Sequence, residues 1–197
     1  MSTREEYRQM AWEMIHEDPS LLKTAYFHEV GKVSYVSGET IEAGAVQISG
    51  TDISFDSETG TISSVTTDLS SIPVKMNSYV FLYGSENSEN TGVYQALTRT
   101  SQEIMFYMPQ FVDESSGRDV SVYGPFTKIQ GVQDTWKSNE LNDLIQSTDI
   151  KMLFAGLDIT WNILATNVAI YNGKRSEVIA PTTDPAEALY TVGLRKG

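Results

Sequence analysis

The stretch VAIYNGKRSEVI, residues 168–179, decides the fold class of this chain. Two runs rich in β-branched and aromatic residues flank Asn172-Gly173. Asn-Gly is the strongest short hairpin signal, because a type I′ turn needs positive φ at both central residues. The sequence therefore predicts an antiparallel hairpin with strands at 168–171 and 176–179. A final strand is predicted at 188–194, entered after a turn at Asp184-Pro185.

The same kind of pattern fills the middle of the chain. Residues 33–122 are rich in Ser, Thr, Val and Ile, and short alternating runs such as 80–83 and 104–107 are separated by Gly and Asn turns. Amphipathic helices between these strands, which βαβ units would require, are missing from the pattern. We therefore expect a mainly β chain with an antiparallel barrel or sandwich.

The N-terminal segment is predicted to be helical instead. Apolar residues recur at spacings of three and four over residues 7–27, and Ser2 or Thr3 followed by Glu5 or Glu6 can form a capping box. Asp18-Pro19 is expected to divide this segment into two short helices.

Composition excludes several classes of chemistry. The chain has 197 residues, two histidines and no cysteine, so disulfides, thiolate nucleophiles and Cys-based zinc sites are excluded. The sequence shows no apolar run of about 18 residues and no hydrophobic N-terminal leader. We expect a soluble protein made in the cytoplasm.

The chain is strongly acidic. Its formal charge of -12 argues against tight DNA binding, which draws its affinity from Lys and Arg. The acidic part is the middle: residues 35–124 carry 12 acidic and 3 basic side chains, a net of -9, and the rest carries 14 and 11, a net of -3.

Four groups of residues invite a catalytic or metal-binding interpretation, and each has a simpler one. His16 and His28 lie twelve residues apart, outside any metal-ligand spacing, and are expected to cap or pack. Asp113, Glu114 and Asp119 lack the Asp/Asn ladder of a calcium loop, so a solvated turn is expected there.

The other two groups are a single serine and two pairs of residues that contain carboxylates. Ser85 follows Gly84 as in a nucleophile elbow, but both histidines precede it and nothing is expected to activate it. Glu13 and Glu17 stand one helical turn apart, as do Asp143 and Ser147 if that stretch is helical, and all four are expected to lie on the acidic surface without a chemical role. Because phosphate-binding glycine motifs are also missing, the sequence predicts no enzyme, no catalytic residue, no metal and no cofactor.

Aromatic residues on the predicted strands point to a different role. Alternate strand residues face opposite sides, so part of this set should lie outside a single core and form a subunit interface. The set comprises Tyr79, Phe81, Tyr83, Tyr94, Phe106 and Tyr107.

The chain resembles tailed-bacteriophage virion proteins in two stretches. The first covers 55–123 and is similar to a small β-module of such proteins, with Gly84-Ser85 after a strand, then 90–94 (Asn-Thr-Gly-Val-Tyr), a strand at 104–106, and Glu114 with Gly117 before a strand at 120–122. The second covers 131–196 and is similar to the C-terminal half of phage neck proteins, the head-closure and head-to-tail connector group. It is carried by Gly131-Val132, the 144–153 stretch, the Asn172-Gly173 hairpin, Asp184-Pro185-Ala186 with Tyr190, and the closing 194–196.

This resemblance implies a small β-barrel domain from residues 1–34 plus 125–197, with residues 35–124 inserted as an acidic β-module. It also implies a homo-oligomeric ring in the virion neck that joins the portal or an adaptor ring to the tail terminator or tube and lets DNA pass, without a membrane.

Two alternatives stay open. One is a tail terminator or capsid decoration protein. The other is a carbohydrate-binding or receptor-binding β-module, in which Trp12, Trp136 and Trp161 would supply stacking platforms. Core or interface packing is the simpler role for these tryptophans.

Overall fold

The computed structural model describes residues 3–28, 32–33, 40–42, 44–75, 78–159, 161, 163–165 and 167–197. Within these ranges the chain is mainly β, with one α-helix at its N-terminus and a twelve-stranded antiparallel sheet. This confirms the fold class predicted from the sequence.

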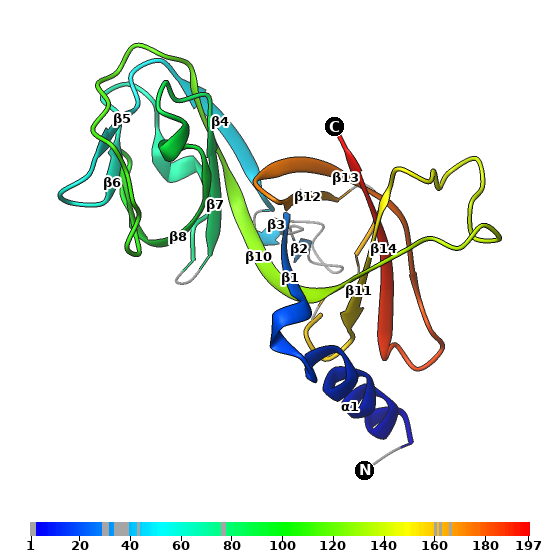
Figure 1. Ribbon diagram of the computed structural model, residues 1–197. Helices are drawn as coiled ribbons and strands as arrows, with labels where there is room; N and C mark the ends of the chain where they lie inside the picture. Colours follow the sequence, from blue (N-terminus) through cyan, green and yellow to red (C-terminus); the bar gives the residue numbers. More distant parts are fainter. Residues whose placement is uncertain are drawn as a thin grey trace. The chain divides into compact units, whose positions relative to one another are not determined.

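The chain forms two compact units. The first comprises Met1–Phe27 and Lys128–Gly197, and the second His28–Thr127. The long strand β10 (Val120–Asp134) contributes to both, because its first residues pair in the second unit and its last residues pair in the first (Figure 1). That residues 35–124 fold as a separate insertion stays a prediction.

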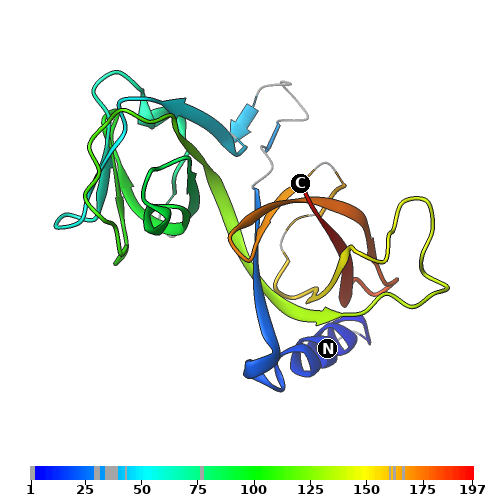
Figure 2. The same cartoon turned by 45° about the horizontal axis from the view of Figure 1, so that its top comes forward.

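The first unit combines a helix with antiparallel strands. Its elements are α1 (Thr3–His16), η1 (Pro19–Leu21), β1 (Leu22–His28), β11 (Ile150–Ala155), β12 (Val168–Tyr171), β13 (Lys174–Thr183) and β14 (Leu189–Lys196). The strand order is β1-β12-β13-β14-β11-β10, and an additional pairing of β1 with β10 closes it into a ring. Figure 2 shows these strands curving around a common interior, with α1 outside them.

Apolar side chains from all around this ring fill its interior. Phe27 of β1 meets Phe154 of β11 and Trp161 edge to face, with ring centroids 5.5 and 6.1 Å apart. Val178 and Val192 complete the contact from β13 and β14. Burial of such side chains stabilises a unit by roughly 1.5 to 3 kcal/mol each. This core therefore holds in place the strands to which α1 is attached.

Two predictions about the first unit have different outcomes. The 168–179 hairpin is confirmed: Val168 pairs with Glu177, and Asn172 and Gly173 have φ of 50° and 69°. The helical prediction for 7–27 is wrong beyond residue 21, since 22–28 is strand β1. Ala25 and Phe27, two residues apart, both point into the core, and this alternation outweighs the spacing of three and four.

The second unit is built from short strands. Its elements are β4 (Val46–Gly50), β5 (Ser54–Asp56), β6 (Thr61–Ser63), η2 (Leu69–Ser71), β7 (Tyr79–Tyr83), η3 (Ser88–Asn90), β8 (Gly92–Arg99) and β9 (Glu103–Phe106), with β2 (Lys32–Val33) and β3 (Thr40–Glu42) as a separate pair. The predicted strands at 80–83 and 104–107 correspond to β7 and β9. The order β10-β7-β8-β9-β6-β5 surrounds its own core of fully buried side chains such as Ile62, Leu82 and Ile104.

Candidate docking groove beside helix α1

An apolar groove of about 560 Å³ lies in the first unit, between α1 and the turn that joins β13 to β14. The helix contributes Tyr7, Met10, Ala11 and Met14, and the turn contributes residues 184–186, 188 and 189. Because grooves of a few hundred Å³ with apolar walls are typical binding sites, this is the candidate functional site.

Polar side chains fix the opposite side of α1 to the unit. The Arg8 Nη2 donates to the Gly156 carbonyl at 2.7 Å, and the Trp12 Nε1 donates to the Asp158 Oδ1 at 3.0 Å. Among the described residues of the helix, Ile15 alone is buried. The inward side of α1 is therefore held mainly by hydrogen bonds from the Arg8 guanidinium and the Trp12 indole.

The other wall is a tight turn that closes on itself. The Asp184 Oδ1 accepts from the Ala188 amide at 2.7 Å, and the Asp184 carbonyl accepts from the Glu187 amide at 2.9 Å. Arg4 of α1 reaches this turn, donating to the Ala186 carbonyl at 3.2 Å and pairing with the Glu187 carboxylate. Both walls are thus fixed before anything binds.

The apolar stripe of α1 faces outward as a result. Tyr7, Met10 and Met14 are 55%, 62% and 60% exposed, and their three- and four-residue spacing places them along one side of the helix. A helix on a monomer normally turns its apolar stripe to the core. Because the apolar stripe of α1 faces solvent and not the core, it indicates a binding surface for another molecule.

Carboxylates lie along both edges of the groove. Glu6 and Glu13 are exposed and stand four and three residues from Met10, so they follow the outer edge of the stripe. Asp184 lines the opposite wall. The groove therefore combines an apolar floor with acidic edges.

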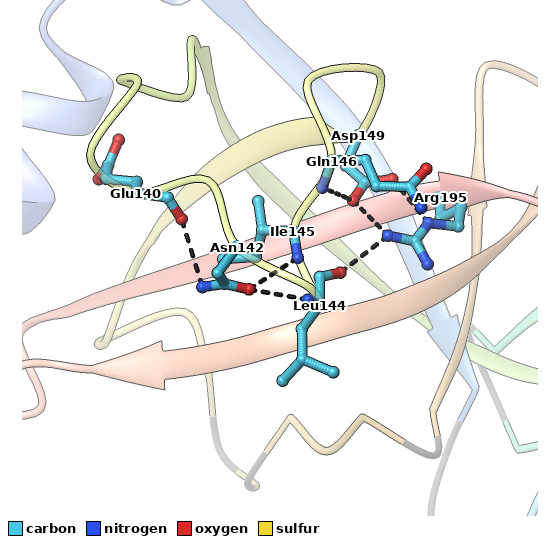
Figure 3. A network of polar contacts seen from close by, with 7 residues as sticks. All are labelled: Glu140, Asn142, Leu144, Ile145, Gln146, Asp149 and Arg195. Carbon is cyan, nitrogen blue, oxygen red and sulfur yellow. Dashed lines mark hydrogen bonds and ion pairs between the residues drawn. The ribbon is translucent and has the colours of Figure 1, made fainter.

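The β10–β11 connection, residues 135–149, is a second exposed feature of the first unit, and it is held in one conformation (Figure 3). The Arg195 guanidinium donates to both oxygens of Asp149 at 2.8 and 2.7 Å and to the Leu144 carbonyl at 2.8 Å. The Asn142 Oδ1 accepts from the amides of Leu144 and Ile145 at 2.8 and 3.0 Å. Leu144 is displayed to solvent, 67% exposed.

Lys151 secures the base of this connection. Its ammonium lies 2.9 Å from a Glu140 oxygen and 3.2 Å from an Asp134 oxygen, and 5.2 Å from the centre of the Trp136 ring. Burial opposes the charged form of Lys151, but the hydrogen bonds that its ammonium donates to Glu140 and Asp134 outweigh it and raise the lysine pKa. Hydrogen bonds from the Lys137 amide and Lys151 lower the pKa of Glu140.

In the second unit, apolar side chains lie exposed on the outer face of β8 and β9. Leu97, Met105 and Tyr107 are exposed there, and Met108 follows with a φ of 45°. A methionine in the left-handed region is uncommon, because its Cβ is crowded against the backbone there.

The residues for which the sequence invited a catalytic or metal-binding interpretation all have structural partners or surface positions. His16 stacks on Trp12 with ring centroids 4.4 Å apart, and its Nε2 lies 3.5 Å from the Asp158 Oδ2. His28 is half-buried at the end of β1. The Ser85 Oγ donates to the Asn87 carbonyl at 2.9 Å.

The acidic cluster at 113–119 is structural, and the expectation of a solvated turn is wrong for Glu114. Its carboxylate accepts from the amides of Glu86 and Asn87 at 2.8 and 3.1 Å and from the buried Asn90 side chain at 2.9 Å. Burial raises the pKa of Glu114, but these donors outweigh it and lower the pKa. Asp113 accepts from the Ser57 amide at 2.8 Å, which lowers its pKa.

In neither pair, Glu13–Glu17 or Asp143–Ser147, do the two residues stand one turn apart on a helix. Glu13 accepts from Gln9 at 2.9 Å, and Glu17 lies beyond the end of α1. Asp143 and Ser147 do not share a helical turn, because that segment belongs to the irregular 135–149 connection.

The aromatic residues proposed as an interface mostly pack inside the chain. Phe81 and Phe106 are buried, and Tyr79, Tyr83 and Tyr94 are half-buried, with Tyr94 against Phe111 at 4.9 Å. Tyr107 is the exposed member of the set. The prediction of a shared interface face is therefore wrong for the buried members, because both sides of β7 are covered, and for the exposed Tyr107 it stays a prediction.

Sequence reasoning missed the groove itself. Met10 and Met14 belong to the apolar spacing that predicts the helix. The direction of that stripe depends on Arg8 and Trp12, which find partners at Gly156 and Asp158, far along the chain. The signal that could have revealed it is the arginine and tryptophan opposite the methionines, which supply polar anchors on the other side of the helix.

In the parts of the chain that the structure describes, no three histidine, aspartate or glutamate side chains come together as a metal site, and no helix is long and apolar enough to cross a bilayer. Comparison with protein-family models, with curated proteins and with solved structures returned no match.

Proposed function

We propose that this chain is a structural subunit of the tailed-phage virion neck, which forms a ring between the portal and the tail and lets DNA pass. The observation that carries the proposal is the outward-facing apolar stripe of α1, Tyr7, Met10 and Met14, on a helix anchored by its polar side. The resemblance to head-closure and connector proteins supplies the kind of assembly.

The energetics favour a protein neighbour for this stripe. Burying a Met side chain stabilises a contact by roughly 1.5 to 3 kcal/mol relative to leaving it in water. Because the helix and the 184–188 turn are fixed beforehand, little conformational entropy is lost on docking. A ring built by repeating one heterologous interface would present this groove once per subunit to the adjoining ring.

The acidic charge suits a conduit. A net charge of -12 repels the duplex, so DNA passes without sticking. In this role the chain needs no chemistry of its own, and the proposal is therefore of a non-enzymatic protein that works without a cofactor.

The test is the mass of the assembly, measured by native mass spectrometry on the chain alone and with the phage portal ring. We expect rings on the portal with the native chain and none with Met10→Glu/Met14→Glu. The matched control Leu141→Glu/Leu164→Glu, also at exposed apolar sites of the first unit, should still assemble. A chain that stays monomeric beside the portal would contradict the proposal.

A tag on Gly197, imaged on whole particles, distinguishes the neck from the alternative positions. Label at the head-tail junction supports the neck, and label at the tail tube or over the capsid assigns a terminator or decoration role instead.

A further inference from the structure

We propose that the groove beside α1 binds an amphipathic segment of a different protein, one that inserts large aliphatic side chains and carries Lys or Arg at its flanks. This inference rests on the proposed assembly role and names the chemistry of the partner at that site.

The apolar half of the inference comes from the shape and lining of the groove. The groove has a volume of about 560 Å³. One wall contains Met10 and Met14, and the other contains Pro185, Ala188 and Leu189. Such a space suits a few aliphatic side chains from one face of a short helix, spaced i, i+3, i+4 and i+7. Flexible methionine side chains adapt well to anchors of different shape.

The basic half comes from the charges at the groove. Glu6 and Glu13 of α1 follow one edge and Asp184 the other. The neighbouring cations are already used: Arg4 pairs with Glu187, and Arg8 donates to the Gly156 carbonyl below the helix. A segment with Lys or Arg beside its anchors complements these edges, and a neutral or acidic one leaves carboxylates facing each other.

A second copy of this chain is a poor occupant on the same grounds. Each copy carries a charge of -12. The most exposed leucine among the described residues, Leu144, stands next to Asp143 and would bring a carboxylate to an acidic edge. Charge complementarity therefore selects a different, basic partner.

The probes are three synthetic helical peptides of about 14 residues, each labelled with a fluorophore. The first has Leu at i, i+3, i+4 and i+7 with Lys at the flanks. The second replaces the Lys residues with Glu, and the third replaces the Leu residues with Ala. Binding to the full chain is measured by fluorescence anisotropy at low and at physiological salt.

Two charge-reversal variants provide the comparison. Glu6→Lys/Glu13→Lys changes the groove edge, and Glu58→Lys/Glu89→Lys makes the same change of net charge at exposed sites in the second unit. Met10→Ala/Met14→Ala removes the apolar floor while keeping a good helix.

We expect the Leu/Lys peptide to bind the native chain and the remote variant equally. We expect its affinity to fall about tenfold for the groove-edge variant and at least as much for the Met-to-Ala variant. Equal binding to all variants, or equally tight binding of the Leu/Glu peptide, overturns the inference. So does a concentration-dependent dimer in sedimentation velocity that the Met-to-Ala variant abolishes, since a second copy then fills the groove.

The mass measurement with the portal separates the two proposals. If the portal ring still captures the native chain and rejects the methionine variants while the Leu/Lys peptide fails, the partner chemistry is wrong and the assembly role stands. If both fail, the assembly role falls as well.

Discussion

At the scale of single residues, Asp149 joins the β10–β11 connection to strand β14. Its side chain is 1% exposed, accepts two hydrogen bonds from Arg195 of β14, and accepts the Gln146 amide at 2.8 Å. A buried carboxylate with this many donors stabilises the fold only while every donor is in place. The Asp149–Arg195 ion pair therefore helps to hold the 135–149 connection, together with the hydrogen bonds of Asn142 and Lys151.

The first prediction concerns its removal. Asp149→Asn should lower the free energy of unfolding by about 2 to 3 kcal/mol at neutral pH, because Arg195 loses its charged partner and one of the two acceptor oxygens becomes an NH2 donor. The control Asp143→Asn makes the same charge change at an exposed position of the same connection and should cost less than about 0.5 kcal/mol. Urea unfolding followed by circular dichroism measures both, and equal losses would contradict the argument.

The second prediction is the pH dependence of the same pair. The Arg195 guanidinium lowers the pKa of Asp149, so the unfolded chain binds this proton more readily than the folded chain. The resulting stability is present above the ordinary carboxyl pKa of about 4 and is lost as the pH falls below it toward the lowered pKa. Urea unfolding between neutral pH and acid should therefore show a shallower decline for Asp149→Asn than for the native chain. Parallel declines would mean that Asp149 does not titrate differently on unfolding.

At the scale of elements, the helix α1 shows that two arginines on one helix can contribute differently to its attachment. Arg8 is half-buried and donates at 2.7 Å to the Gly156 carbonyl, and Arg4 forms an ion pair in which its side chain is 53% exposed. Exposed pairs contribute little, and a charged donor in a partly buried hydrogen bond contributes more. The attachment of α1 therefore depends on Arg8 and Trp12 more than on Arg4.

The third prediction tests this difference. Arg8→Ala should release α1 and speed amide hydrogen exchange in residues 3–16 about tenfold, which corresponds to about 1.4 kcal/mol. Arg4→Ala should change the exchange less than about threefold. Exchange read by mass spectrometry reports both. An effect of Arg4→Ala as large as that of Arg8→Ala would show that the helix is held at the turn instead.

Elements differed in how far the sequence could predict them. The 168–179 hairpin was predictable because Asn172-Gly173 dictates its turn locally. Strand β1 was not, since Leu21, Leu22 and Tyr26 satisfy a helical spacing and only the closure of the ring against β12 and β10 selects the strand. Local signals decide turns, and pairing with distant segments decides ambiguous apolar runs.

The candidate site was harder to predict than the fold. Its walls come from residues 7–14 and 184–189, and no short-range pattern brings these segments together. The predicted surface of aromatic strand residues failed where both faces of a strand are covered, as at Phe81. A sequence shows which residues are apolar, but the outward direction of Met10 and Met14 follows from where Arg8 and Trp12 find acceptors.

At the scale of the whole molecule, the two units have separate cores that share the strand β10. Phe27, Phe154 and Val192 belong to one core, and Ile62 and Leu82 to the other. All three tryptophans, Trp12, Trp136 and Trp161, lie in the first unit. Intrinsic tryptophan fluorescence therefore reports the first unit alone, and far-ultraviolet circular dichroism reports the strands of both.

The fourth prediction uses this asymmetry. Ile62→Ala removes a fully buried side chain from the second core and should cost that unit about 2 to 5 kcal/mol. In thermal unfolding, part of the circular dichroism signal should then be lost at lower temperature, while the tryptophan transition keeps its midpoint. Val192→Ala, in the first core, should move the tryptophan transition instead. If Ile62→Ala shifts both signals together, strand β10 couples the units into one cooperative structure. The α1 groove would then depend on the acidic module for its stability, because a loss in the second core would loosen the platform that holds the helix.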